Sequence, residues 1–111
     1  MTIDVHHRDG VHIVRPMGEL TAGHEMEFIQ AVTDLFSGPG VRILIDLHDV
    51  PFMDSTGLGA MVRVGAQANV QEGRLVLASP SPFIEGVLQT TQLDRFFRIH
   101  KTTDEALRAL A

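Results

Sequence analysis

Residues 41–62 read VRILIDLHDVPFMDSTGLGAMV, and this stretch decides the fold. Its first part, VRILIDL over residues 41–47, is a nearly continuous β-branched and apolar run, which predicts a strand covered on both faces. Its last part opens LGAMVRVGAQAN, residues 58–69, whose apolar spacing predicts a helix. The polar tetrapeptide DSTG, residues 54–57, separates the two. A strand followed directly by a helix is the first half of a crossover, which joins strands that pair in parallel.

The residues before this stretch predict a hairpin and a first helix. Asp9-Gly10 separates two β-rich runs, residues 3–8 and 11–16, and this dipeptide is a strong signal for a two-residue hairpin loop. Thr21 is placed to cap the helix that follows. The inward face of that helix is expected to consist of Phe28, Ile29, Val32, Leu35 and Phe36. SGPG, residues 37–40, ends the helix.

The residues after the stretch continue the alternation of helix and strand. The side chains expected to pack inward from the helix at residues 58–69 are Leu58, Met61, Val62, Gly65 and Asn69. Gly73 closes that helix just past its end. RLVLA, residues 74–78, predicts a short buried strand. Ser81-Pro82 then provides a cap and a first-turn proline for a third helix over residues 83–89.

A short strand and a C-terminal helix complete the order. FRIH, residues 97–100, predicts the strand, and Thr102 with Glu105 has the spacing of a capping box for a helix that ends at Ala111. The order is therefore hairpin, helix, strand, helix, strand, helix, short strand, helix. We expect an α/β fold, one domain over residues 1–111, in which helices cover a mixed sheet.

The composition narrows the class of partner. The chain has 111 residues, of which 44% are hydrophobic and 21% charged, as in ordinary globular domains. A net charge of −5 and the absence of Trp and Tyr argue against a nucleic-acid partner. The absence of Cys removes disulfides and thiolate metal sites, and it suits a cytoplasmic protein. No apolar run approaches the roughly 20 residues that span a bilayer, so we expect no membrane insertion.

The tetrapeptide at residues 54–57 is the candidate functional site. Ligand-contacting loops collect at the carboxyl ends of strands in α/β sheets. The first turn of a helix also carries unpaired N–H groups and the positive end of the helix dipole. Ser55 as the N-cap would accept from one of these N–H groups, and the same groups would favour a phosphate on its hydroxyl. Gly57, Gly59 and Ala60 weaken the start of the helix, but they would let a partner approach it closely.

Other interpretations stay open at this point. Asp, Ser, Thr and Gly also make up ordinary strand-to-helix turns, so DSTG alone fits a turn and a cap. Ser55 as a hydrolase nucleophile has no histidine that can be assigned to activate it. His7 and His12 would face each other across the hairpin, but two imidazoles make only half a metal site. We therefore expect no metal, no cofactor and no enzymatic activity.

PFMDSTGLGAMV, residues 51–62, resembles the signature of the STAS family, the domain shared by bacterial anti-sigma factor antagonists and the cytoplasmic tails of sulfate transporters. The likeness extends over almost the whole chain. The segments that fall in the family's order and spacing are GEL at 18–20, VRILIDL at 41–47, DSTGLG at 54–59 and RLVLASPSP at 74–82. The resemblance implies a mixed sheet with helices packed mainly on one face, which agrees with the order derived from the residues.

The resemblance also implies a stand-alone anti-sigma factor antagonist. In phosphorylatable members the serine directly after the motif aspartate is the switch, and here that is Ser55, with Thr56 as the alternative acceptor. The unphosphorylated form would bind an anti-sigma factor that is also a serine kinase, and this would free a sigma factor for transcription. Phosphorylation would dissociate the complex, and a metal-dependent serine phosphatase would reverse it. The implied partner surface consists of Thr21, Asp54, Thr56, Gly57, Leu58 and Gly59.

One residue departs from the family pattern. Many antagonists carry an aspartate near the phosphorylation loop, after the Gly-Glu-Leu segment, and this chain has Thr21 there. Threonine brings no charge, so the departure bears on phosphorylation more than on the fold. The alternative function is a STAS module that does not switch, a scaffold subunit of a transporter or of a signalling assembly. In that case DSTG would serve only as a cap and a turn.

Overall fold

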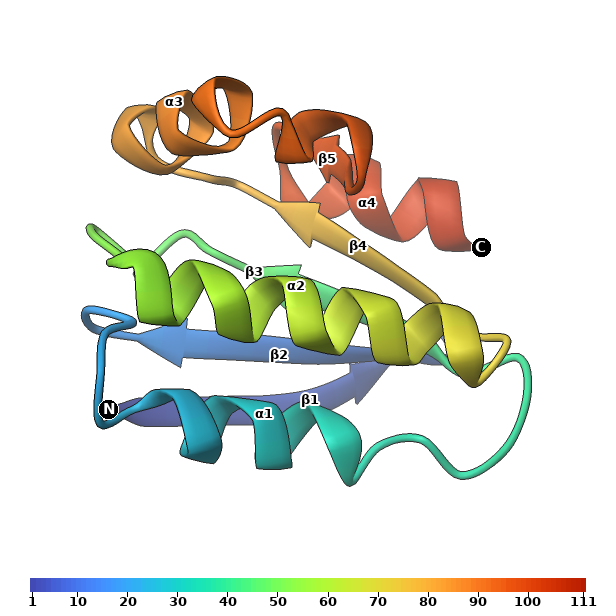
Figure 1. Cartoon of the computed structure of the whole chain (residues 1–111). Coiled ribbons are helices and arrows are strands. Elements are labelled where there is room, and N and C mark those ends of the chain that lie inside the picture. Colours follow the sequence, from blue (N-terminus) through green and yellow to red (C-terminus); the bar gives the residue numbers. More distant parts are fainter.

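A five-stranded sheet with four α-helices forms the protein, and the computed structural model describes residues 1–111 (Figure 1). The elements in chain order are β1 (Thr2–Arg8), β2 (Val11–Met17), α1 (Glu25–Thr33), β3 (Arg42–Asp46), α2 (Ser55–Val70), β4 (Arg74–Ala78), α3 (Pro82–Thr90), the short 3-10 helix η1 (Leu93–Arg95), β5 (Arg98–His100) and α4 (Thr103–Leu110). The predicted order of elements is confirmed.

The strands lie side by side in their sequence order. β1 and β2 pair antiparallel across the predicted hairpin, and Asp9 and Gly10 have φ angles of 53° and 77°, the left-handed conformation that such a two-residue loop requires. The register places His7 opposite His12, as expected. β2, β3, β4 and β5 then pair in parallel. The predicted mixed sheet is therefore confirmed.

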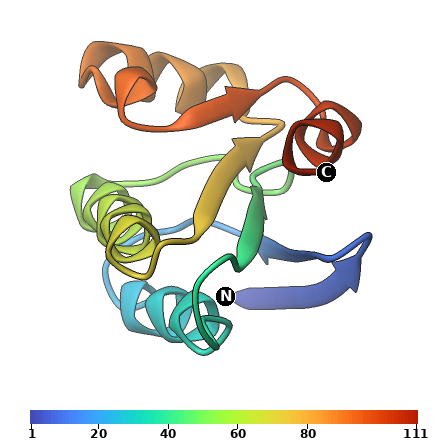
Figure 2. The same cartoon turned by 90° about the vertical axis from the view of Figure 1, so that its right-hand side faces the viewer.

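The helices lie mainly on one face of the sheet. Right-handed crossovers that always advance in the same direction place their helices on the same face. α1, α2 and α3 accordingly share one hydrophobic core with that face, and only α4 packs on the other (Figure 2). The larger core contains Phe28, Met61 and Ile84 from the three crossover helices, and the smaller one contains Leu107 and Leu110 from α4.

The first helix begins later than predicted. It starts at Glu25, its N-cap is His24 without a side-chain cap, and Thr21 lies outside it. The reason is that Leu20 is held in a parallel bridge with Met53, so the chain is still extended when it reaches Thr21. The helix also ends at Thr33, before Leu35 and Phe36, although these two side chains still pack against the larger core.

The predicted inward face of α2 was partly wrong. Asn69 is exposed and Val62 is only half-buried, whereas Ala60, Val64 and Ala68 are buried. Small alanines are buried here because α2 lies close to the sheet. The prediction favoured large side chains, so it placed the buried face of the helix at the wrong angle around the helix axis. The end of α2 also differs: Glu72, not Gly73, has the left-handed φ of 57°. Gly73 has another reason to be small, since a Cβ there would lie 2.8 Å from the carbonyl oxygen of Val41.

Two predicted caps near the C-terminus are confirmed. Ser81 Oγ accepts from the backbone N–H of Ile84 at 3.2 Å, and Thr102 Oγ1 accepts from that of Glu105 at 3.1 Å. The Glu105 carboxylate accepts in turn from the N–H of Lys101, one residue before the position that a capping box uses. α4 ends at Leu110, with Ala111 as its C-cap.

Candidate partner-binding surface

Two loops run side by side at the carboxyl edge of the parallel strands, where DSTG lies. The backbone N–H of Gly18 donates to Asp49 O, and that of Leu20 donates to Phe52 O, both at 3.0 Å. The loop after β2 therefore follows the loop after β3 as an additional short parallel pairing, which ends at the bridge between Leu20 and Met53. This arrangement brings two segments far apart in sequence to the start of α2.

Asp54 is the N-cap of α2, and the prediction that Ser55 caps this helix was wrong. Asp54 Oδ1 accepts from the N–H of Gly57 at 2.9 Å, and Asp54 Oδ2 accepts from that of Ala22 at 3.1 Å. One carboxylate thus caps α2 and ties the loop after β2 to it. Ser55 is the first residue of the helix itself.

The hydrogen bonds to Asp54 also fix its charge. The N–H of Gly57 lowers the pKa of this carboxyl more than desolvation raises it, and the N–H groups of Ala22 and Thr56 lower the pKa further. Asp54 is therefore an anion at neutral pH. It stands directly before the candidate switch residue.

The hydroxyls of Ser55 and Thr56 are exposed, and neither makes a hydrogen bond within the protein. Asp54 occupies the capping position, so the helix cap does not use the Ser55 hydroxyl. Thr21 lies between the bridged Leu20 and Ala22, whose N–H donates to Asp54. The role of these residues in binding a partner stays a prediction.

The small residues at the start of α2 do not share one role. Gly57 is buried, and a Cβ there would lie 1.9 Å from the carbonyl oxygen of Leu20. Ala60 also faces the core, and Leu58 is half-buried against it. Only Gly59 is open to solvent, with no atom within 4 Å of the position that a Cβ would take. The expectation that all three small residues leave room for a partner was therefore wrong for Gly57 and Ala60.

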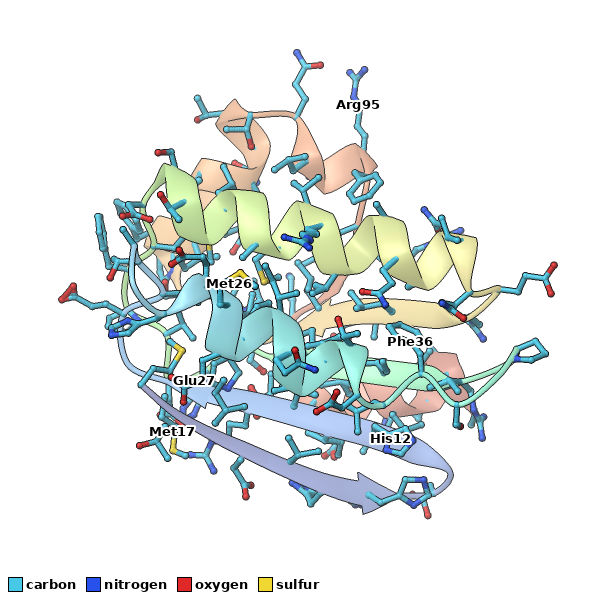
Figure 3. All side chains as sticks on the ribbon, turned by 60° about the horizontal axis from the view of Figure 1, so that its bottom comes forward. His12, Met17, Met26, Glu27, Phe36 and Arg95 are labelled. Atoms are coloured by element: carbon cyan, nitrogen blue, oxygen red, sulfur yellow. The ribbon has the colours of Figure 1, made fainter.

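Sequence reasoning missed an aromatic pair beside DSTG. Phe52 and Phe83 have ring centroids 5.2 Å apart, and they are 39% and 48% exposed. Met26, in the first turn of α1, is 58% exposed (Figure 3). The available signal was that each Phe directly follows a proline at the carboxyl edge, but their pairing requires the fold. The two rings leave an exposed apolar area between the loop that precedes α2 and the start of α3.

The histidine pair on the hairpin does not extend to a metal centre. The His7 and His12 rings are 4.7 Å apart in a T-shaped contact, and burial followed by the charge of His7 lowers the pKa of His12. No group of three or more His, Cys, Asp or Glu side chains is placed to hold a metal ion. None of the helices combines the length and the apolar character that crossing a membrane requires.

Alanine substitutions at Gly57 and Gly59 should change stability in opposite directions. Gly57→Ala forces a methyl group against the backbone of Leu20, and we expect the free energy of unfolding to fall by about 2–3 kcal/mol. Gly59→Ala adds an exposed helix-favouring residue, and we expect a rise of about 0.5–1 kcal/mol. Urea unfolding followed by circular dichroism measures both. Equal effects of the two variants would contradict the close packing of Gly57.

Replacing Asp54 by Asn should make a stability difference that depends on pH. Because the folded-state pKa of Asp54 is lowered, its ionisation stabilises the fold above the unfolded-state pKa, and this contribution is lost as pH falls through the folded-state pKa. Asn retains a capping oxygen but no charge. We expect wild type to be the more stable at pH 7 and the gap to begin narrowing as the pH falls below about 4. Urea unfolding between pH 7 and pH 3 tests this, and a gap independent of pH would refute it.

Comparison with known proteins identifies the family. The STAS domain family matches residues 2–106. A candidate anti-sigma factor antagonist of Thermotoga neapolitana is 36% identical over 100 residues, which are 89% of this chain and 88% of that protein. The anti-sigma F factor antagonist of Lysinibacillus sphaericus is 32% identical over 83 residues, which are 73% of this chain and 70% of that protein.

A solved structure agrees with the sequence comparison. The crystal structure of a candidate anti-sigma factor antagonist from Thermotoga maritima matches with a TM-score of 0.89 at 32% identity, over 97% of this chain and 93% of that one. The resemblance seen in residues 51–62 is thereby confirmed, and so is the fold that it implied. With its signature at the start of α2 and its sheet in sequential order, the protein belongs to the STAS domain family.

Proposed function

We propose that this protein is an anti-sigma factor antagonist that is switched by phosphorylation at Ser55. Its relatives at more than 30% identity carry the name of that function, which supports the general role. The unphosphorylated form binds an anti-sigma factor with serine kinase activity in the cytoplasm and so frees a sigma factor. A serine phosphatase of the metal-dependent type reverses the modification. The protein itself is a kinase substrate and performs no catalysis.

The free hydroxyl of Ser55 is the observation that carries this proposal. It is exposed at the first residue of α2 and has no internal hydrogen-bond partner, so a kinase can reach it without breaking the helix cap. A phosphate there gains from the positive end of the helix dipole. It also adds roughly −1.5 to −2 charges directly beside the Asp54 anion. A partner that packs closely on this surface would have to desolvate both anions, which opposes rebinding.

The aromatic pair supplies the apolar part of the same surface. Phe52 lies three residues before Ser55. The Phe83 ring, in the first turn of α3, contacts the ring of Phe52. Exposed aromatic side chains of this kind provide much of the binding free energy in protein interfaces. Thr21 borders Asp54 without adding charge, so the anti-sigma factor meets one carboxylate at this point and not two. The proposed interface therefore combines Thr21, the two phenylalanines and the residues of the segment 54–59 other than the buried Gly57.

Substitutions at Ser55 should separate a switch from a scaffold. We expect Ser55→Ala to keep binding to a kinase-type anti-sigma factor and to lose phosphate incorporation from ATP. Ser55→Asp should weaken binding by at least about tenfold, because it places a second carboxylate beside Asp54. Calorimetry measures binding, and intact mass with fragmentation locates the phosphate.

Each contrary outcome points to a different conclusion. Phosphate on Thr56 would keep the switch and move it by one residue. Full binding by Ser55→Asp together with no phosphate on either hydroxyl would favour the scaffold alternative. Ester hydrolysis that Ser55→Ala removes would instead support a nucleophilic serine.

Alanine at the aromatic pair should weaken partner binding without unfolding the protein. Phe52→Ala and Phe83→Ala each remove a half-exposed ring, and we expect each to raise the dissociation constant by about tenfold or more. Val70→Ala is the control, since Val70 is 80% exposed at the opposite end of α2 and should have no effect on binding. Calorimetry with the same anti-sigma factor gives the comparison. Unchanged affinity in both Phe variants would remove the pair from the interface.

A further inference from the structure

A groove of about 530 Å³ lies at the opposite end of the molecule from Ser55, where β4 begins. It exists because β5 is short. Arg98, the first residue of β5, pairs with Val76, so Arg74 and Leu75 of β4 have no neighbour on that side. The end of α2, the start of β5 and the last turn of α4 enclose the space that is left. This size is within the range of small-molecule sites, about 300–1,000 Å³.

Three basic side chains of this groove project from the same face of the sheet. Val76 and Ala78 belong to the core under α4, and Arg74 shares their parity along β4. Arg98 and His100 stand opposite Val76 and Ala78 in the parallel register. Arg74, Arg98 and His100 therefore all line the groove from the α4 side.

The positive charge of this groove is not neutralised. No Asp or Glu lines it, and neither arginine has a carboxylate within 4.0 Å. Arg74 donates one hydrogen bond at 3.2 Å to the carbonyl oxygen of Ala109, where it meets the negative end of the α4 dipole. The Arg98 guanidinium and the His100 ring have no hydrogen-bond partner in the protein. Capping of α4 thus accounts for one hydrogen-bond donor of Arg74, and it explains neither Arg98 nor His100.

We propose that this groove binds a small phosphate monoester whose organic part contains a flat ring. Two guanidinium groups match a dianionic phosphate better than a single carboxylate, because each offers paired N–H donors. The volume leaves room for more than the phosphate group. Phe96, 42% exposed at one side of the groove, offers a ring face for stacking, and Asn69 adds an amide that both donates and accepts. The net charge of −5 disfavours an extended polyanion such as RNA.

This site is independent of the proposed function. Ser55 opens α2, whereas Asn69 stands in its last turn, so a ligand in the groove and a partner on the Ser55 surface can be bound together. We therefore expect Arg98→Gln to leave binding of the anti-sigma factor unchanged, and Ser55→Asp to leave ligand binding in the groove unchanged. Failure of one proposal is thus distinguishable from failure of the other.

Titration of the labelled protein with phenyl phosphate tests the proposal. We expect saturable changes in the amide NMR spectrum at Gly73, Leu75 and Arg98, with half-saturation below about 1 mM. Arg98→Gln should weaken binding by about tenfold or more, since it removes a charge-assisted contact. Arg95→Gln is the matched control: it removes the same charge from η1, where the side chain extends into solvent outside the groove (Figure 3), and it should change affinity by less than about twofold.

A second pair of measurements tests the ring. Phe96→Leu keeps an apolar side chain over Gly65, and it should weaken phenyl phosphate more than inorganic phosphate. Three results would overturn the proposal: no saturation up to about 10 mM, equal losses in Arg98→Gln and Arg95→Gln, or amide changes that map to the Ser55 end of α2. Binding of single-stranded RNA in the absence of any phenyl phosphate binding would likewise reject a small-molecule site.

Discussion

The complete burial of the three central residues of β3 is the constraint on which the rest of the structure depends. Ile43, Leu44 and Ile45 have no exposed surface, and they alternate between the two cores. A strand of this kind needs a paired neighbour at each edge and cover on both faces. Parallel neighbours require crossovers, and right-handed crossovers that advance in one direction place α1, α2 and α3 on the same face. The other face is then left to α4, the only helix that follows the last strand.

The same arrangement makes the candidate site, because the carboxyl ends of β2 and β3 are neighbours. Asp54 uses one carboxylate oxygen for Gly57 of α2 and the other for Ala22 after β2. The capping carboxylate and the proposed phosphorylation site thereby belong to adjacent residues. If Ser55 were the cap, attaching a phosphate would disturb the contact that starts the helix. With Asp54 in that position, the Ser55 hydroxyl can change its charge while the cap remains.

The sequence predicted those features that depend on local patterns. Asp9-Gly10, the apolar run at residues 41–47 and the caps at Ser81 and Thr102 were found because each needs only a few neighbouring residues. The errors arose where contacts between segments distant in sequence determine the local structure. Thr21 is kept out of α1 by a bridge to the loop after β3, and the buried role of Gly57 follows from contact with Leu20.

The aromatic pair of the partner-binding surface and the basic groove also depend on contacts between segments distant in sequence. Phe52 and Phe83 are about 30 residues apart in the chain, and no spacing rule pairs them. The basic groove results from the short length of β5, which leaves the start of β4 without a neighbour. Such features become visible only when strand register and element ends are known.

The direction of the strands also separates charge along the molecule. β3, β4 and β5 each begin with an arginine, whereas Asp46 ends β3 and Asp49 and Asp54 follow it, with Asp49 paired to Arg15. Arg42 and Arg74 donate hydrogen bonds to the last carbonyl oxygens of α4. These two arginines at the amino edge therefore stabilise the negative end of the α4 dipole. α2 joins the acidic edge to the basic edge, and its 16 residues span about 24 Å. Since charges are screened over about 8 Å at physiological salt, a phosphate on Ser55 would be electrostatically independent of an anion bound beside Arg98. Any coupling between the two ends would therefore have to pass through the packing of α2 against the sheet.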